Sequence, residues 1–401
     1  MMKKTNLFYW LVLLICVGGT SSIVVAVNLH VKQVLVDGEN GVDGLDNPRH
    51  IALSSNNRYT FVTSADDNAL LILKVGETLT PITTFRNDLD PNYKLEGASR
   101  VVSFGEPFTA AIASFYDSSL TLFTLNPSKQ NPDNFSWVNA HSDNLSYERI
   151  FKSNEDLGDL DALGLLGAWD VIVTPDEKQV FVASYQSNAV TVFNAVANAS
   201  LAFDSKLSFW EGSDASLGRP VSLAYAKRYN ELVVAGFEGN VLSIFKKEQD
   251  GSFVFKNAIR QDDDKQKLLA NPQHILFSPN EQFLYVACSG SQSIVVFERV
   301  DDEFVYKQAI TNADIGGVGL NGVSSLVTTG DGKLLFAAGE FDEGLLVFNV
   351  SDIGEVAFAQ HFKGAANDIK GITSIAITND DKHLLLSLGK QDALYMIQVT
   401  D

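Results

Sequence analysis

Two histidines, an arginine and an aspartate could act in one site, because they occupy the same point of a pattern that recurs along the chain. They are His50, Arg100, Asp170 and His274. An imidazole can serve as a general base or activate water, and a guanidinium can bind an anion or polarise a carbonyl group. The alternative is that these side chains hydrogen-bond to one another and to water. The choice depends on a fold that gathers corresponding points of the pattern in one place.

The recurring pattern is three short strands separated by two turns. Its clearest copy is NPQHILFSPNEQFLYVACSGSQSIVVFE, residues 271–298. The turn Ser278–Asn280 contains proline, which presets φ, and asparagine, which tolerates left-handed backbone. Copies are expected at residues 47–75, 97–125, 167–193, 218–245, 271–298, 322–348 and 371–399. A period of about 50 residues with several strands in each period is typical of a β-propeller.

A propeller blade needs a fourth strand, and candidates lie between the copies. Phe253–Ile259, Phe304–Ile310 and Ala357–Phe362 follow three of them. The last copy has no such strand after it, whereas His30–Val36 precedes the first copy. The sequence therefore predicts an all-β fold with one domain at residues 27–401. This domain is a seven-bladed propeller with four-stranded antiparallel blades, and its N-terminal strand completes the last blade and leaves no open sheet edge.

Such a ring would bring the aligned residues to one end of a central channel. Each of them begins an innermost strand: His50, Arg100, Asp170, Ser222, His274, Ser325 and Ser374. Arg49 and Trp169 flank this set and could clamp a ligand or stack on it. A ring of polar side chains that only lines the channel is the competing interpretation.

A second group of candidate ligands is acidic. Asp37, Glu39, Asp43 and Asp46 lie in one short glycine-rich loop, and a similar loop contains Glu155, Asp156, Asp159 and Asp161. Carboxylate-rich loops with glycine turns suit Ca²⁺, although the spacing differs from that of an EF-hand. Solvated turn acids are the alternative.

The first residues predict export. Lys3 and Lys4 precede an apolar stretch from Leu7 to Val17, and small residues follow near position 26, as in a secretory signal at residues 1–26. The apolar stretch is shorter than a membrane span, so we expect cleavage and a periplasmic or extracellular chain without stable membrane insertion. Lipidation at Cys16 and retention as an uncleaved anchor are the alternatives. We also expect a monomer. The formal net charge of −19 excludes nucleic acid as a partner. Cys288 would then be a lone thiol, buried as a small apolar group or, with a histidine nearby, nucleophilic.

One segment departs from the period. Residues 126–144, NPSKQNPDNFSWVNAHSDN, are rich in asparagine, proline and serine. We expect them to leave the third strand of the second blade on the face opposite the histidines. They would form either a partner-binding loop or an excursion held down by Trp137.

The stretch Asp37–Ser54, DGENGVDGLDNPRHIALS, and the recurring SPN and LYVA segments resemble the lactonase-like propellers with YVTN-type repeats. Asp67–Leu70 and the variant Gly316–Gly322 extend the resemblance over nearly the whole chain. It implies the seven-bladed fold. Enzymatic relatives resembling 6-phosphogluconolactonases or muconate cyclases place His, Arg and Glu at the channel mouth.

The resemblance implies site residues at the strand entries PRH, residues 48–50, and PQH, residues 272–274, and at Gly339–Glu340. Transferred to this chain, it gives His50, His274, Arg100 and Glu340 as catalytic candidates. The ligand-binding candidates are Arg49, Trp169, Asp170 and Gln273.

Two functions remain open on these residues. The first is a scaffold that binds a small molecule or an extracytoplasmic protein. The second is a hydrolase of lactones that uses the His and Arg side chains of the channel mouth. No cofactor other than calcium is indicated.

Overall fold

The structure is a computed structural model that describes residues 27–142, 161–196, 200–209, 213–260, 268–364 and 368–400. The signal predicted at residues 1–26 lies outside these ranges, as do Glu155, Asp156 and Asp159 of the second acidic loop. Within the described ranges, no helix has both the length and the apolar character that crossing a membrane requires.

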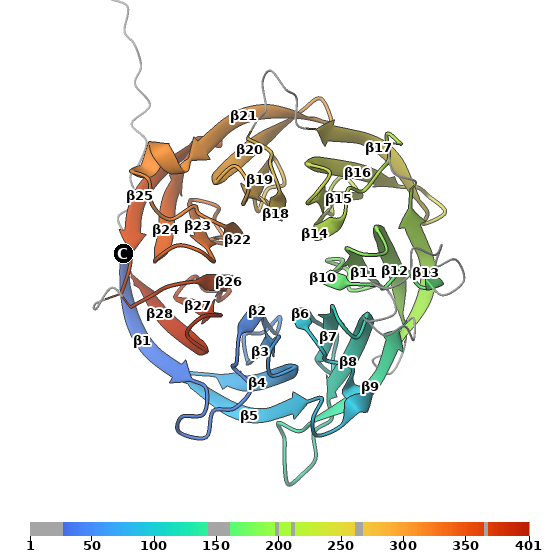
Figure 1. Ribbon diagram of the computed structural model, residues 1–401, viewed down its shortest axis with the longest axis vertical. Helices are drawn as coiled ribbons and strands as arrows, with labels where there is room; N and C mark the ends of the chain where they lie inside the picture. Colours follow the sequence, from blue (N-terminus) through green and yellow to red (C-terminus); the bar gives the residue numbers. More distant parts are fainter. Residues whose placement is uncertain are drawn as a thin grey trace, which may run out of the picture.

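Seven four-stranded antiparallel sheets form a ring around one axis (Figure 1). From the axis outward, blade 1 contains β2 (Pro48–Leu53), β3 (Tyr59–Ser64), β4 (Ala69–Val75) and β5 (Leu79–Arg86). Blade 2 contains β6 (Ala98–Phe104), β7 (Thr109–Ser114), β8 (Ser119–Leu125) and β9 (Phe135–Ser142). Blade 3 contains β10 (Ala168–Val173), β11 (Gln179–Ser184), β12 (Ala189–Val196) and β13 (Ser200–Ser208).

The other four blades have the same order. Blade 4 contains β14 (Pro220–Ala226), β15 (Glu231–Gly236), β16 (Val241–Lys247) and β17 (Phe253–Arg260). Blade 5 contains β18 (Pro272–Phe277), β19 (Phe283–Cys288), β20 (Ser293–Val300) and β21 (Glu303–Thr311). Blade 6 contains β22 (Val323–Thr328), β23 (Leu334–Gly339), β24 (Leu345–Val350) and β25 (Val356–Phe362). Short 3-10 helices, η1 (Pro91–Tyr93) and η3 (Asn312–Ile315), lie in loops.

The two ends of the chain close the ring in blade 7. Its strands, from the axis outward, are β26 (Ile372–Ile377), β27 (His383–Leu388), β28 (Ala393–Thr400) and β1 (Asn28–Val36). β1 runs antiparallel to β28, with Leu29 opposite Val399 and Val36 opposite Ala393. Figure 1 shows the blue β1 beside the red β28. The predicted fold and its closure by the N-terminal strand are therefore confirmed.

The turn chemistry seen in the sequence sets the first hairpin of most blades. In blade 5 the Ser278 hydroxyl bonds to the Asn280 side chain at 2.7 Å and accepts the Phe283 amide at 2.9 Å. Glu281 then takes a left-handed conformation with φ 58°. The Thr174–Asp176, Thr329–Asp331 and Thr378–Asp380 pairs repeat the same short bond at 2.7 Å. A hydroxyl followed two residues later by Asn or Asp is thus the local signal for this turn.

The core lies between blades rather than within any one of them. Every residue of β3, β7, β11, β15, β19 and β23 is buried, because each of these second strands has a neighbouring blade on both faces. Apolar side chains therefore occur on both faces of these strands, as in FLYVAC of β19, and the polar residues among them are buried as well. Each blade is therefore stabilised by apolar contacts with the blades on both sides of it.

One sequence prediction was wrong. Phe135–Ser142, expected to belong to an excursion, is β9, the outer strand of blade 2. Phe135 is buried and packs edge-on against Tyr59 of blade 1, with ring centroids 5.1 Å apart. The polar composition hid this strand, since only one side of an outer strand needs apolar residues. The remaining loop is fixed at Asp133, whose carboxylate oxygens pair with Arg58 and Lys74 of blade 1, each at 2.7 Å.

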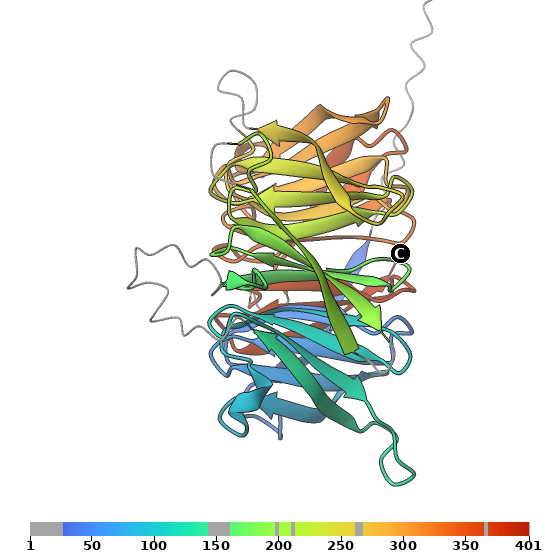
Figure 2. The ribbon, with the colours of Figure 1, turned by 90° about the vertical axis from the view of Figure 1, so that its right-hand side faces the viewer.

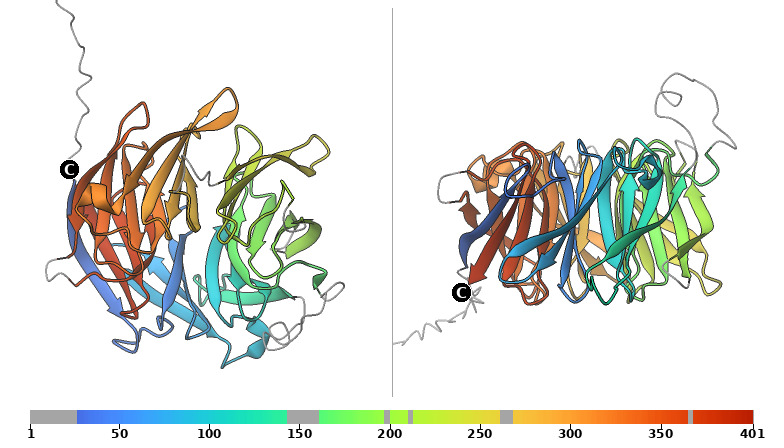
Figure 3. Two further views of the ribbon diagram at one scale, coloured as in Figure 1. Left: turned by 45° about the horizontal axis from the view of Figure 1, so that its top comes forward. Right: turned by 90° about the horizontal axis from the view of Figure 1, so that it is seen from below.

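Seen from the side, the ring is a disc whose strands run between two faces (Figure 2). Two further views show the same flat ring tilted and from below (Figure 3). We call the face where the inner strands begin, at Pro48 in blade 1, the mouth face. The face where the second strands begin, at Tyr59 in blade 1, is the far face.

Removal of β1 should destabilise the ring. A chain that begins at Asp37 loses the ladder to β28 and the buried Leu29, whose burial alone stabilises by about 2 kcal/mol. We expect its melting temperature to fall by several degrees relative to a chain that begins at Val27. Thermal unfolding followed by circular dichroism tests this, and equal melting temperatures would contradict closure by β1.

Candidate functional site

A β-bulge at the start of each inner strand builds the mouth. In every blade the register between the first two strands shifts and leaves one residue unpaired, as between Pro48 and His50 in blade 1. The seven unpaired residues are Arg49, Ser99, Trp169, Val221, Gln273, Ser324 and Thr373. A bulge re-aims the side chain of its extra residue, and here it directs that residue away from the ladder.

Six of these seven residues line one cavity of about 380 Å³ at the mouth face, and only Val221 does not. Arg100 lines the same cavity, together with Phe115, Tyr116 and Asp66. The structure thus brings four predicted residues together: Arg49, Arg100, Trp169 and Gln273. Ser99, Ser324 and Thr373 were missed, although their position beside the strand entry was a signal that could have found them. Phe115 and Tyr116, which follow the second strand of blade 2, were missed as well.

Arg49 and Glu340 form an ion pair beside this cavity. Arg49 Nη1 lies 2.9 Å from Glu340 Oε1, and Nη2 lies 3.4 Å from Oε2. The two residues come from blades 1 and 6, so the pair passes over the intervening blade 7. Each side chain is 25% exposed. The predicted Glu340 therefore belongs to the mouth, with its carboxylate oriented by a bidentate guanidinium.

Aromatic side chains of blades 2 and 3 form one wall of the cavity. Phe115 packs edge-on against Trp169, with ring centroids 5.6 Å apart, and against Tyr116 at 5.3 Å. This wall offers an apolar surface to a ligand. Another part of the lining offers a free polar atom: the Ser324 hydroxyl is buried and has no hydrogen-bond partner among the described residues.

One position further along, the predicted ring of polar residues ties the blades together. An inner strand is the edge of its sheet, so the amide groups on its free edge need hydrogen-bond acceptors from outside that sheet. Six ring side chains accept an amide from the next blade: His50 from Val101 (3.4 Å), Asp170 from Leu223 (2.7 Å), Ser222 from Ile275 (3.1 Å), His274 from Leu326 (3.1 Å), Ser325 from Ile375 (2.9 Å) and Ser374 from Ile51 (3.3 Å).

Arg100 is the exception, since a guanidinium has no acceptor atom. The amide it would have bound, that of Val171, is bonded instead to Asp170 Oδ1 at 2.9 Å. Asp170 thus accepts two amides, one on each oxygen, and its Oδ1 lies 3.7 Å from Arg100 Nε. Burial raises the pKa of Asp170, and Arg100 opposes the shift. Asp170 therefore satisfies two backbone amides and lies beside Arg100. The Arg100 guanidinium, which has no amide to bind, lines the cavity.

The two histidines are held as neutral rings. Burial, reinforced by the positive charge of Arg100, lowers the pKa of His274 to about 3 and that of His50 well below 6.5. In both rings Nδ1 accepts a backbone amide, so the proton of the neutral ring is on Nε2. Each ring can then donate a hydrogen bond from Nε2 but cannot take up a proton there. The catalytic roles predicted for them remain predictions, and this geometry favours the donor role.

The acidic loop between β1 and β2 gathers carboxylates beside the β3–β4 turn of blade 1. One oxygen from each of Asp37, Asp43 and Asp67 lies within 4.8 Å of the others. Arg86 supplies the opposite charge, with Nη1 2.7 Å from Asp43 and 3.4 Å from Asp67. Asp67 was not among the predicted ligands. The calcium ligands predicted at Asp37, Glu39, Asp43 and Asp46 remain a prediction.

Cys288 is a buried free thiol on β19. Burial raises its pKa far above the ordinary value, which disfavours the nucleophilic thiolate. This geometry favours the packing role over the catalytic one.

A closed ring of seven four-stranded blades with a polar and aromatic cavity at its axis defines the propeller class. A family model described as "Lactonase, 7-bladed beta-propeller" matches residues 168–400, more than half of the chain, and the chain belongs to this family. Comparison with curated proteins found no match.

Solved structures share the fold at low sequence identity. A protein from Lactobacillus plantarum has a TM-score of 0.64 at 13% identity, covering 88% of each chain. A candidate 6-phosphogluconolactonase from Bacteroides fragilis has a TM-score of 0.62 at 14% identity, covering 88% of this chain and 87% of the other. Another from Bacteroides uniformis has a TM-score of 0.60 at 17% identity, covering 86% and 90%.

The double acceptor should matter more to stability than the single ones. Asp170→Ala leaves two amides without acceptors, at about 1–3 kcal/mol each, whereas Ser222→Ala leaves one. We expect Asp170→Ala to lose roughly twice as much unfolding free energy in urea as Ser222→Ala. Equal losses would show that the Val171 amide does not depend on Asp170.

The two ring histidines should make the fold sensitive to acid. The pKa of His274 is lower in the folded than in the unfolded chain, so unfolding takes up protons below about pH 6.5 and stability falls as pH falls. His274→Asn keeps an acceptor for Leu326 but does not titrate. Between pH 7.5 and 4.5 the variant should lose about 1–3 kcal/mol less than the parent. The same change at the exposed His30 is the control, and identical pH profiles for all three proteins would contradict the prediction.

Proposed function

We propose that the cavity at the mouth face hydrolyses a small lactone. The observation that supports this most is a cavity of about 380 Å³ lined by the guanidinium groups of Arg49 and Arg100, with the Glu340 carboxylate paired to Arg49. The lactonase family and the candidate 6-phosphogluconolactonases of the same fold support the same class of reaction.

Glu340 would serve as the general base. Arg49 orients its carboxylate through two contacts, and the 25% exposure of the side chain leaves it accessible to water. Each carboxylate oxygen has lone pairs beyond the one directed at Arg49, so a water molecule can still donate to it.

Arg100 would stabilise the charge that develops on the carbonyl oxygen. Its guanidinium is held at one side by Asp170, 3.7 Å away, and is only 14% exposed. A cation in a site of low exposure stabilises an oxyanion more than it would in water. His50 and His274 are not among the residues that line this cavity, so this step assigns them no role.

The reaction then balances without a cofactor. Water attacks the carbonyl carbon while Glu340 accepts its proton, and the oxyanion forms beside Arg100. When the oxyanion collapses, the ring C–O bond breaks and the leaving alkoxide takes the proton from Glu340. The product is a hydroxy acid, which loses its carboxyl proton to solvent. Trp169 and Gln273 would hold the ligand, through its apolar face and a hydroxyl group respectively.

A second function, binding without turnover, is favoured by a different observation. The two ring histidines accept backbone amides and have depressed pKa values, so neither offers a basic nitrogen to the cavity. The mouth would then be the binding site of a scaffold that recognises a small molecule or an extracytoplasmic protein.

One set of variants separates the two functions. A panel of lactones, including glucono-1,5-lactone and γ-butyrolactone, is hydrolysed with the parent, Glu340→Gln and Arg100→Met, and acid release is followed in a pH-stat. If Glu340 is the base, its loss should slow turnover about 10²- to 10⁴-fold. Glu298→Gln is the matched control, because Glu298 pairs with Lys307 at 2.8 Å on blade 5, away from the mouth.

The outcomes point to different conclusions. Turnover by the parent that is lost in both mouth variants supports the hydrolase. No turnover by the parent, with binding of a lactone that weakens in Arg100→Met, supports the scaffold. Turnover that survives both substitutions would exclude the proposed machinery.

A further inference from the structure

A second cavity, of about 520 Å³, opens between blades 3 and 4 at the far face. Its blade 3 wall comes from the start of β11 and from β12 and β13, and its blade 4 wall comes from the end of β16 and the turn into β17. We call it the side groove. The residues that matter below are Gln179, Asn194, Asp204, Ser205, Lys247 and Phe253.

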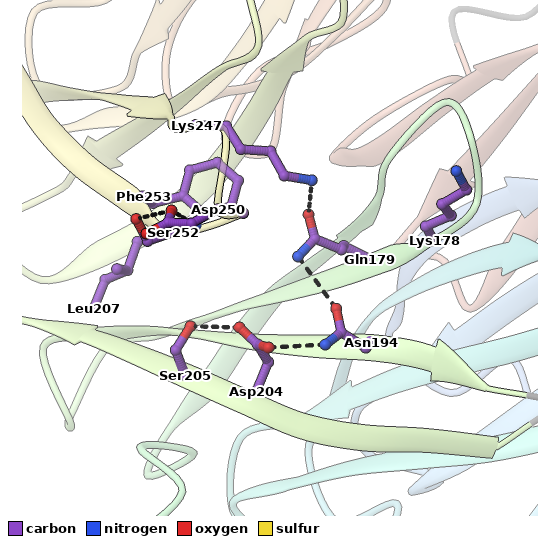
Figure 4. A pocket seen from close by; sticks show the side chains of 11 residues that line it. Lys178, Gln179, Asn194, Asp204, Ser205, Leu207, Lys247, Asp250, Ser252 and Phe253 are labelled. Carbon is purple, nitrogen blue, oxygen red and sulfur yellow. Dashed lines mark hydrogen bonds between the residues drawn. The ribbon is translucent and has the colours of Figure 1, made fainter.

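A chain of hydrogen bonds crosses the side groove (Figure 4). Lys247 Nζ donates to Gln179 Oε1 at 2.5 Å, and Gln179 Nε2 donates to Asn194 Oδ1 at 3.2 Å. Asn194 Nδ2 then donates to Asp204 Oδ1 at 2.8 Å, and the Ser205 hydroxyl donates to Asp204 Oδ2 at 2.9 Å. The ammonium group thus meets a neutral amide, and the carboxylate lies at the opposite end of the chain.

The next junction, between blades 4 and 5, shows what these positions hold when the space is filled. Glu231 begins β15 as Gln179 begins β11, and Arg299 is opposite Phe304 as Lys247 is opposite Phe253. Glu231 is fully buried and pairs with Arg299 Nη1 at 2.8 Å and with Lys256 at 3.0 Å. The cations of that junction therefore have an internal carboxylate.

Aromatic packing closes the same junction. The Arg299 guanidinium lies between two rings, 3.8 Å from the centroid of Tyr229 and 4.2 Å from that of Phe304. In the side groove the residue two places before Gln179 is the exposed Glu177 rather than a tyrosine, and Lys247 is shorter than arginine. Its ammonium lies 5.8 Å from the Phe253 centroid, and the remaining space stays open.

The side groove has Gln179 where the next junction has Glu231. Among the described residues, no carboxylate is therefore in direct contact with the Lys247 ammonium group. Asp176 is within electrostatic range, but its carboxylate accepts the Thr174 hydroxyl at 2.7 Å and lies 3.8 Å from Lys178. Asp250 likewise bonds to Ser252. An outside carboxylate could therefore reach Lys247 without displacing an internal one.

We propose that the side groove binds a small polyhydroxy carboxylate, with the carboxylate on Lys247 and hydroxyl groups on Asp204, Asn194 and Ser205. A charge-assisted bond to the ammonium would supply the anchor, and the side-chain carboxylate, amide and hydroxyl are good partners for sugar-like hydroxyls. A volume of about 520 Å³ is within the ordinary range for small-molecule sites. The site is independent of the mouth and of turnover there.

The test uses D-gluconate as the probe and isothermal titration calorimetry on the full chain. We expect Lys247→Met to weaken binding about tenfold or more, since it removes a charge-assisted contact. Gln179→Glu should weaken it similarly, because it supplies the internal carboxylate that Glu231 supplies in the next junction. Sorbitol, which has the hydroxyls but no carboxylate, should not bind.

Two controls locate the site. Lys178→Met removes the same charge from the rim of the groove, where the side chain is 79% exposed, and should change affinity less than about threefold. Arg100→Met alters the mouth and should leave this binding intact. Melting temperatures confirm that each variant is folded.

Three outcomes would overturn the proposal. They are no binding of gluconate by the parent up to about 10 mM, equal weakening by Lys178→Met and Lys247→Met, and loss of binding in Arg100→Met alone. The last would assign gluconate to the mouth and would bear on the lactonase proposal instead.

Discussion

Every inner strand of this propeller is the edge of its own sheet, and the unpaired amides of that edge must be satisfied next to the central axis. The chain meets this constraint with side chains at one repeated position, which accept an amide from the next blade. Serine, histidine and aspartate can all serve, because each offers an acceptor within reach. Arginine cannot, and the second oxygen of Asp170 replaces the acceptor that Arg100 lacks.

Because Asp170 takes over the acceptor role, the position of Arg100 is open to a side chain that can bind a ligand. A residue freed from the structural ring can face the cavity, and Arg100 is the ring member that lines it. The bulge before the ring adds Arg49, Trp169 and Gln273, and Arg49 in turn orients Glu340. Much of the mouth is therefore built from β-bulge residues, whose side chains are not fixed by the regular strand ladder.

At the far face, too, one repeated position holds different residues in different blades. The first residue of the second strand is Tyr59 in blade 1, Gln179 in blade 3, Glu231 in blade 4 and Phe283 in blade 5. Tyr59 packs its ring against Phe135, Phe283 is buried in an apolar cluster, and Glu231 forms an ion cluster with Arg299 and Lys256. Gln179 does none of these, which leaves the side groove open.

The sequence by itself determined the number of blades, their strands and the closure by the N-terminal strand. These follow from apolar runs, turn residues and the period, which are local and repeat seven times. It also placed Arg49, Arg100, Trp169 and Gln273 at one end of the ring, because equivalent points of a repeat must converge on the axis. It misjudged β9, whose sequence FSWVNAHS mixes polar and apolar residues without a clear strand pattern, and it could not assign roles within the ring. Whether a histidine is a base or an amide acceptor depends on a backbone group about 50 residues away in the next blade. Only the tertiary structure brings that group to the ring nitrogen, and only burial in the assembled ring lowers the pKa of the imidazole.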